Sequence, residues 1–170
     1  MKGYLMPHPP LLVPGVGRGG EAPDTEQACR RVATEIEKIK PDTVVVISPH
    51  SVMYADFFHI APGKAAAGDF GSFGAKQIKI SVNYDEEFAR LIGKLAQEKG
   101  LPAGPLGEKK TVLDHGVMVP LHFLKSERIV RISLSGLSAI DQLPFGNMHS
   151  GGRRTAGAEF RHYRQRGYVA

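Results

Sequence analysis

The stretch Thr43-Val44-Val45-Val46-Ile47-Ser48-Pro49-His50 decides the fold. Its β-branched run, Thr43–Ile47, is typical of a strand that is buried on both faces, as strands of parallel sheets are. The segment before it, Ala22–Lys40, repeats apolar residues at helical spacing and ends at a proline. Lys2–Met6 is a short strand candidate ahead of that helix. Together these segments predict a β-α-β unit.

The rest of the chain continues the alternation of strands and helices. Asp114 is a good N-cap for a helix that begins at the next residue. This order predicts an α/β fold with a mainly parallel or mixed sheet flanked by helices, in which ligands bind beyond the carboxyl ends of the strands. We expect strands at Phe57–Ala61, Gln77–Val82 and Arg128–Leu134, helices at Asp85–Lys99 and His115–Lys125, and a glycine-rich loop at Gly63–Gly74.

Length and composition fit a single globular domain. The 170 residues are 42% hydrophobic, and no apolar run approaches the roughly 20 residues of a membrane helix. No signal-peptide pattern follows Met1, and the single cysteine, Cys29, cannot form an internal disulfide. We therefore expect a cytoplasmic protein that does not span a membrane.

The positive charge lies at one end of the sequence. The tail 146–170 holds five arginines against one acid, Glu159, and so contributes +4 of the net charge of +5, which leaves +1 for residues 1–145. A nucleic-acid-binding domain would carry a basic patch on its folded part. We expect no specific nucleic-acid partner, and polyanion binding by the tail, which salt would weaken steeply, ranks last among the functions considered.

Two histidines occupy equivalent positions after predicted strands. His8 follows the first strand and His50 follows Thr43–Ile47, and each comes directly after a proline that stiffens its approach. Either one alone is more simply a surface histidine at a strand end. Together, at the same edge of a sheet, they favour a transition-metal site, because rigid imidazoles from separate elements are what such a metal requires. Two histidines suit Zn(II) and Cu(II) as well as iron.

Five segments resemble the class III, LigB-type extradiol dioxygenase superfamily, and more narrowly its AmmeMemoRadiSam branch, related to the Memo proteins. The resemblance covers residues 1–145 and implies an α/β fold in which Fe(II) is held by two histidines, matched here by His8 and His50, and by a carboxylate that has no match. It also implies a small aromatic substrate and O2. The segments are Tyr4–Pro10, Pro41–His50, Asp69–Ala75, Leu113–Leu121 and Ser133–Leu137.

His115 matches the position of the family's active-site histidine at a helix start. The positive end of a helix dipole disfavours imidazolium, so a neutral His115 can exchange a hydrogen bond with a phenolate. We take His115 as the candidate catalytic residue, and Asp114 with His115 as candidate substrate-binding residues. The alternative is a helix-cap histidine paired with Asp114. His59 and His122 lie in apolar segments and are expected to serve packing.

The tail 146–170 departs from the family. The family continues into a helix and a strand that ends in an active-site histidine, whereas this tail has no helical or strand periodicity. Shifting the reading frame by one nucleotide after Met148 lets residues 159–170 read NFVIIASGDMSH, which resembles the family's closing motif. We expect 1–145 to be the N-terminal portion of the domain and 146–170 to be an out-of-frame tail, so that the C-terminal part of the fold is missing.

Two functions therefore remain ahead of polyanion binding. The first is an extradiol ring-cleavage dioxygenase-like domain that binds Fe(II) through His8 and His50, impaired or inactive as written because the carboxylate ligand and a base are absent. The second is a Memo-like module that binds a ligand or partner without ring cleavage. Uncovered apolar surface would also favour self-association into a homo-oligomer.

Overall fold

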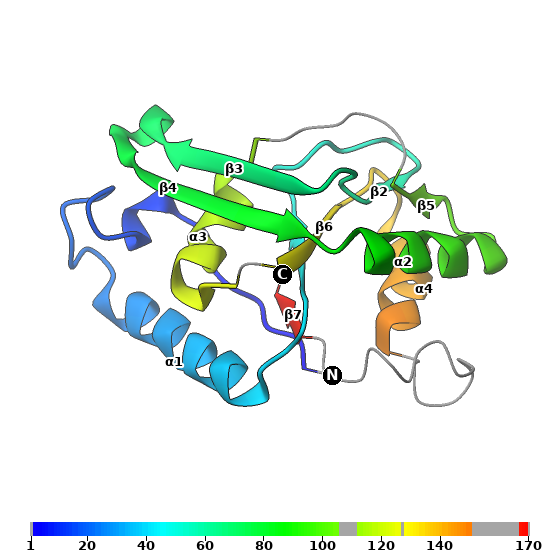
Figure 1. Ribbon diagram of the computed structural model, residues 1–170, viewed down its shortest axis with the longest axis horizontal. Helices are drawn as coiled ribbons and strands as arrows, with labels where there is room; N and C mark the ends of the chain where they lie inside the picture. The colour runs from blue at the N-terminus through cyan, green and yellow to red at the C-terminus, as the bar shows by residue number, and fades with distance from the viewer. Residues whose placement is uncertain (1, 106–111, 127, 151–166, 170) are drawn as a thin grey trace.

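A five-stranded mixed sheet forms the centre of the molecule (Figure 1). The computed structural model describes residues 2–105, 112–126, 128–150 and 167–169. All neighbouring strands run parallel except β3 and β4, which form an antiparallel hairpin. The predicted α/β architecture is thereby confirmed. In spatial order the strands are β3 (Ala65–Phe70), β4 (Ala75–Tyr84), β6 (Arg128–Ser133), β1 (Val44–Ser48) and β7 (Gly167–Val169).

Strand β1 is buried on both faces, as its β-branched run predicted. Val44 and Val46 belong to a core cluster shared with helices α1 (Pro23–Ile39) and α3 (His115–Leu124). Val45 points the other way, into a cluster shared with α2 (Glu86–Glu98) and α4 (Ala139–Ser150). Because successive side chains of a strand point to opposite faces, this one run of valines contributes to the hydrophobic core on both sides of the sheet.

The predicted helices are confirmed to within two residues, and two of them begin at an aspartate N-cap. Asp85 accepts a hydrogen bond from the backbone N–H of Phe88 at the start of α2, and Asp114 accepts one from Val117 at the start of α3. A carboxylate at this position satisfies a backbone donor that the helix leaves unpaired. Within the described part of the chain, no helix is both long and apolar enough to cross a membrane.

The strand predicted at Lys2–Met6 is wrong. These residues form no strand, and the chain continues into a short 3-10 helix, η1 (Pro10–Leu12). The two hydrogen-bonding edges of β1 are taken by β6 and β7, so the N-terminal segment has no partner edge there. The segment is held by side chains, with Met6 3% exposed against the α1–α3 core.

The loop predicted at Gly63–Gly74 is wrong as well. Residues 65–70 form β3, paired antiparallel with β4, and Gly71–Phe73 form the 3-10 helix η2. A Cβ on Gly68 would lie 2.7 Å from the sulfur of Met118 and 2.8 Å from the carbonyl oxygen of Leu113. Gly68 therefore allows α3 to approach β3 closely. The glycines of this segment were the reason for predicting a loop.

The strand predicted at Phe57–Ala61 is present in shortened form. Its regular part is β2 (Phe58–His59), which pairs in parallel with β5 (Ala103–Gly104) in a separate two-stranded sheet. Ile60 adds an isolated bridge to Ile132 of the main sheet.

The tail carries regular structure at two places where none was expected. Helix α4 runs on to Ser150, and it begins directly after Ser138, whose hydroxyl accepts a hydrogen bond from the backbone N–H of Asp141. Strand β7 lies on the edge of β1, which offers it unpaired backbone groups. The remainder of the predicted tail, 151–166 and 170, lies outside the described residues.

Candidate metal centre

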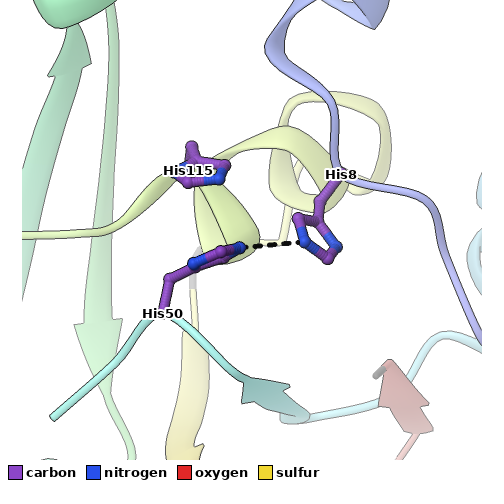
Figure 2. Close-up of side chains that lie close together, drawn as sticks. All are labelled: His8, His50 and His115. Carbon is purple, nitrogen blue, oxygen red and sulfur yellow. Dashed lines mark hydrogen bonds between the residues drawn. The ribbon is translucent and has the colours of Figure 1, made fainter.

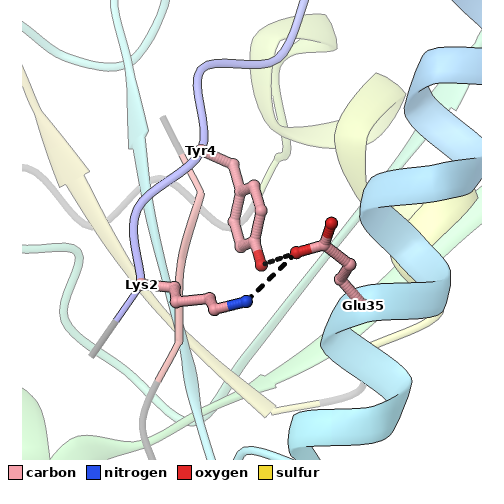
Figure 3. Close-up of polar contacts among 3 residues, drawn as sticks. All are labelled: Lys2, Tyr4 and Glu35. Carbon is pink, nitrogen blue, oxygen red and sulfur yellow. Dashed lines mark hydrogen bonds and ion pairs between the residues drawn. The ribbon is translucent and has the colours of Figure 1, made fainter.

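His8 lies on the N-terminal segment, which three kinds of contact hold in place. The hydroxyl of Tyr4 donates a hydrogen bond of 2.9 Å to Glu35 of α1, and Lys2 pairs with the same carboxylate oxygen at 3.3 Å (Figure 3). The side chain of Met6 is buried in the core, and the prolines on either side of His8 restrict the backbone there. The imidazole is therefore presented by a fixed segment even though that segment is not a strand.

His50 lies two residues beyond the end of β1. Its backbone N–H donates a hydrogen bond of 3.2 Å to the hydroxyl of Ser48, which is fully buried. This bond turns the chain at the end of the strand, and the ring of His50 is exposed at the carboxyl edge of the sheet. Its position is the one that the α/β architecture assigns to ligand-binding residues.

His115 is the first residue of α3 and completes the group. Its ring centroid is 4.1 Å from that of His50 and 5.8 Å from that of His8, and Phe73 of η2 contacts it edge-on at 5.5 Å. Partial burial, and then the neighbouring His50, hold the pKa of His115 below its ordinary value. The neutral imidazole is the form that can accept a proton or bind a metal.

The three histidines are close enough to share one metal ion (Figure 2). The Nε2 atoms of His8 and His50 are 3.1 Å apart, and one ligand atom of each histidine lies within 4.8 Å of the others. With metal–nitrogen bonds of about 2.1 Å, a 3.1 Å separation corresponds to a ligand–metal–ligand angle of about 95°. The donor set fits a first-row transition metal; within the described residues this group contains no carboxylate.

An open cleft of about 580 Å³ adjoins the group on the side of the N-terminal segment. Apart from the imidazoles of His8 and His115, its walls are apolar. Leu5 stands at its edge and is 89% exposed. A cleft with apolar walls and a few converging polar groups is typical of a small-molecule site. The lining residues are Leu5, Met6, Pro7, His8, Pro9 and His115.

Asp114 lies beside the histidines with both carboxylate oxygens already bonded. Oδ1 accepts hydrogen bonds from the Ser48 hydroxyl at 2.6 Å and from the Val117 N–H at 3.1 Å. Oδ2 accepts one from the Ser51 hydroxyl at 2.8 Å. Sequence reasoning missed Ser48 and Ser51, although the pattern of a serine on each side of Pro49-His50 was visible.

Gly116 is a further residue that the sequence analysis missed. A Cβ at this position would lie 2.5 Å from the Ser48 hydroxyl and 3.0 Å from Cδ2 of His50. Only a glycine lets α3 approach the His50 turn this closely. The sequence did contain a sign of this contact, because a glycine within a predicted helix is unfavourable and often marks a place where another segment packs closely.

The other two histidines considered lie outside this group. His59 is 1% exposed in β2, and His122 is half-buried on α3, where its ring meets that of Phe123 edge-on at 5.3 Å. Both are packed as expected from their apolar surroundings.

An α/β sheet that gathers three imidazoles at its carboxyl edge has a group of side chains that could hold a metal ion. Comparison of the sequence with protein families adds the class of protein, because residues 2–147 match the family described as the catalytic LigB subunit of aromatic ring-opening dioxygenase. The chain therefore belongs to the LigB family.

Two curated relatives extend the comparison. Protein CA_C1420 of Clostridium acetobutylicum is 33% identical over 156 residues, a match that covers 84% of this chain and 33% of that protein. The beta subunit of 2-aminophenol 1,6-dioxygenase from a Pseudomonas species is 25% identical over 138 residues, covering 75% of this chain and 45% of the subunit. The chain thus spans between a third and a half of the length of these relatives.

Proposed function

We propose that the chain is the metal-binding part of an extradiol ring-cleavage dioxygenase-like domain, with Fe(II) held by His8 and His50. The observation that carries the proposal is the 3.1 Å separation of their Nε2 atoms at the carboxyl edge of the sheet. One Nε2 atom can donate a hydrogen bond to the other at this distance, and when neither carries a proton both can bind the same ion. Family membership favours iron over the zinc and copper that the same donors would accept.

The cleft supports a small aromatic substrate beside the metal. When bound, Fe(II) supplies Lewis acidity toward adjacent phenolic oxygens and the electron transfer that chemistry with O2 requires. The apolar walls would contact an aromatic ring. His115 lines the same cleft, and we assign to it the exchange of a proton with a phenolic hydroxyl.

We further propose that the tail 146–170 is out of frame and that the chain as written turns over little or no substrate. The end of the family match at residue 147 supports this division. So do the apolar side chains of Ile140 and Leu143 on α4, which are 78% and 60% exposed. Sequencing the gene across codons 145–148 tests the first part: a related gene that keeps the same frame and still encodes the arginine-rich tail would contradict it.

A second candidate is a Memo-like module that binds a ligand or partner without ring cleavage. The observation that favours it is the donor set, because the described residues bring three imidazoles and no carboxylate to the group. Such a set also suits Zn(II), which carries out no redox chemistry. Ligand binding that does not require a metal would support this candidate.

Anaerobic titration of the whole chain with Fe(II), followed by a panel of catechols with O2 uptake as the readout, tests the metal site and the proposed inactivity. We expect Fe(II) to bind, His8→Ala and His50→Ala to abolish binding, and O2 uptake to be weak or absent. His122→Ala is the matched control, because His122 lies on the same helix as His115 but outside the group. Failure to bind Fe(II) would contradict the metal site, and robust turnover would contradict the proposed inactivity.

A further inference from the structure

Asp114 joins three parts of the chain through one carboxylate. Its Oδ1 atom bonds the hydroxyl of Ser48 at the end of β1 and the N–H of Val117 in the first turn of α3. Its Oδ2 atom bonds the hydroxyl of Ser51 in the turn that follows His50. An N-cap requires only the bond to Val117. The other two bonds therefore serve something besides the start of the helix.

The two serines lie on either side of His50. The Ser48 hydroxyl also accepts a hydrogen bond from the backbone N–H of His50. Because Ser48 and Ser51 both donate to Asp114, the residues on either side of His50 are held by the same carboxylate. His115 follows Asp114 directly and its ring lies 4.1 Å from that of His50. The carboxylate thus connects the segment that carries His50 to the helix that carries His115.

The close approach of the two segments is built into the sequence at Gly116. Its missing Cβ leaves room for the Ser48 hydroxyl, the Asp114 carboxylate and the His50 ring, all of which would lie within 3.0 Å of that atom. A network that needs a glycine and two serines to form is more than an incidental surface contact. Ser48 is fully buried, which strengthens its hydrogen bond to Asp114.

We propose that Asp114 is a positioning residue that fixes His50 relative to His115, and that it does so through Ser48 and Ser51. The inference rests on the proposed metal function and deepens it. In this role Asp114 acts through Ser48 and Ser51, and the metal is held by the histidines of the group. Partners that orient metal-binding histidines typically change metal affinity by about 10–100-fold when they are removed.

Asp114→Ser separates positioning from capping. Serine is a good N-cap, so α3 keeps its first hydrogen bond, but a single hydroxyl cannot hold Ser48 and Ser51 together. Ser51→Ala is the second variant, because it removes only the bond to Oδ2 and leaves the cap and Ser48 unchanged. Asp85→Ser is the matched control: Asp85 caps α2 and also bonds Thr43, but no histidine of the group lies beside it.

The experiment titrates the full chain with Co(II) and records both the affinity and the visible d–d spectrum, with urea unfolding as the measure of stability. We expect Asp114→Ser to weaken Co(II) binding about 10–100-fold and to alter the spectrum, and also to lower the urea midpoint, as Asp85→Ser does, because each variant loses a hydrogen bond from a buried hydroxyl. Ser51→Ala should change affinity and spectrum in the same direction by a smaller factor. Asp85→Ser should lower the urea midpoint and leave affinity and spectrum unchanged.

The outcomes distinguish this inference from the proposed function. If the wild type binds Co(II) and both Asp114→Ser and Ser51→Ala match its affinity and spectrum, the positioning role is overturned while the metal site stands. If the wild type binds no Co(II), the metal site fails and the positioning role fails with it. If Asp114→Ser does not fold, the spectrum and affinity of Ser51→Ala decide, and wild-type values there overturn the role.

Discussion

Replacing Gly116 with alanine should destabilise the protein, although the same change in an ordinary helix would stabilise it. Gly116 is the second residue of α3, and the difference between glycine and alanine in a helix interior, about 1 kcal/mol, is the upper limit of the gain from helix propensity. Propensity alone therefore predicts a gain in the free energy of unfolding. The sign of the measured change depends on what the new methyl group meets.

The methyl group of Gly116→Ala has no free space. It would lie 2.5 Å from the Ser48 hydroxyl, and 3.0 Å from both Oδ1 of Asp114 and Cδ2 of His50. Ser48 is fully buried and hydrogen-bonded, so it cannot move aside without breaking its bond to Asp114. Inserting a methyl group into a filled site typically costs about 1–3 kcal/mol. This cost exceeds the gain in helix propensity, and relief of the clash moves the His50 ring.

Urea unfolding of Gly116→Ala measures the effect, and Gly3→Ala is the control because a Cβ at Gly3 meets nothing within 4 Å. We expect a lower free energy of unfolding for Gly116→Ala, little change for Gly3→Ala, and weaker Co(II) binding by Gly116→Ala alone. A Gly116→Ala protein that is more stable than the wild type and binds Co(II) equally well would refute the described packing of α3 against the His50 turn.

Three further predictions concern the fold around the site. Thr43→Val removes the buried hydrogen bond from Thr43 to Asp85 and should lower the free energy of unfolding by about 1–3 kcal/mol in urea. Phe145→Ala removes a ring stacked at 4.2 Å on a phenylalanine of β2 and should cost about 3–5 kcal/mol in the same assay; an unchanged midpoint would argue against this packing of α4. The hydrogen bond from Tyr4 holds the pKa of Glu35 below its ordinary value, so the bond contributes stability above the unfolded pKa, and this contribution is lost as the pH falls through the folded pKa. Tyr4→Phe should therefore flatten the acid side of the stability profile, and an unchanged profile would contradict the contact.

The parts of the fold that the sequence predicted are those set by local periodicity. The run Thr43–Ile47 and the amphipathic segments Ala22–Lys40 and Asp85–Lys99 each specify a burial pattern within one element, and all three are present. The helix expected after the N-cap Asp114 is present as well, and it is buried on nearly all sides. His50 lies at the carboxyl edge of the sheet, as its place after a parallel strand predicted. His8 lies beside it, but for a different reason, because Lys2–Met6 forms no strand and side chains hold the segment instead.

The parts that the sequence did not predict depend on contacts between distant segments. Residues 65–70 were predicted to be a loop, but they form a strand because they pair with β4. Gly68 in this strand leaves room for the side chain of Met118. Arg131 is 1% exposed in β6 and donates a hydrogen bond to the carbonyl of Val112, a burial that no pattern of charge along the chain indicates. The bonds of Asp114 to Ser48 and Ser51 likewise span more than 60 residues and follow only from the tertiary fold.

The central claim is that His8 and His50 together hold one metal ion at the carboxyl edge of the sheet. Isothermal titration of the metal-free chain with Zn(II), compared with the single variants His8→Ala and His50→Ala, tests it most directly because Zn(II) needs no anaerobic handling. We expect one ion per chain for the wild type and loss of that site in each variant. A wild-type stoichiometry near zero, or variants that bind Zn(II) as tightly as the wild type, would contradict it.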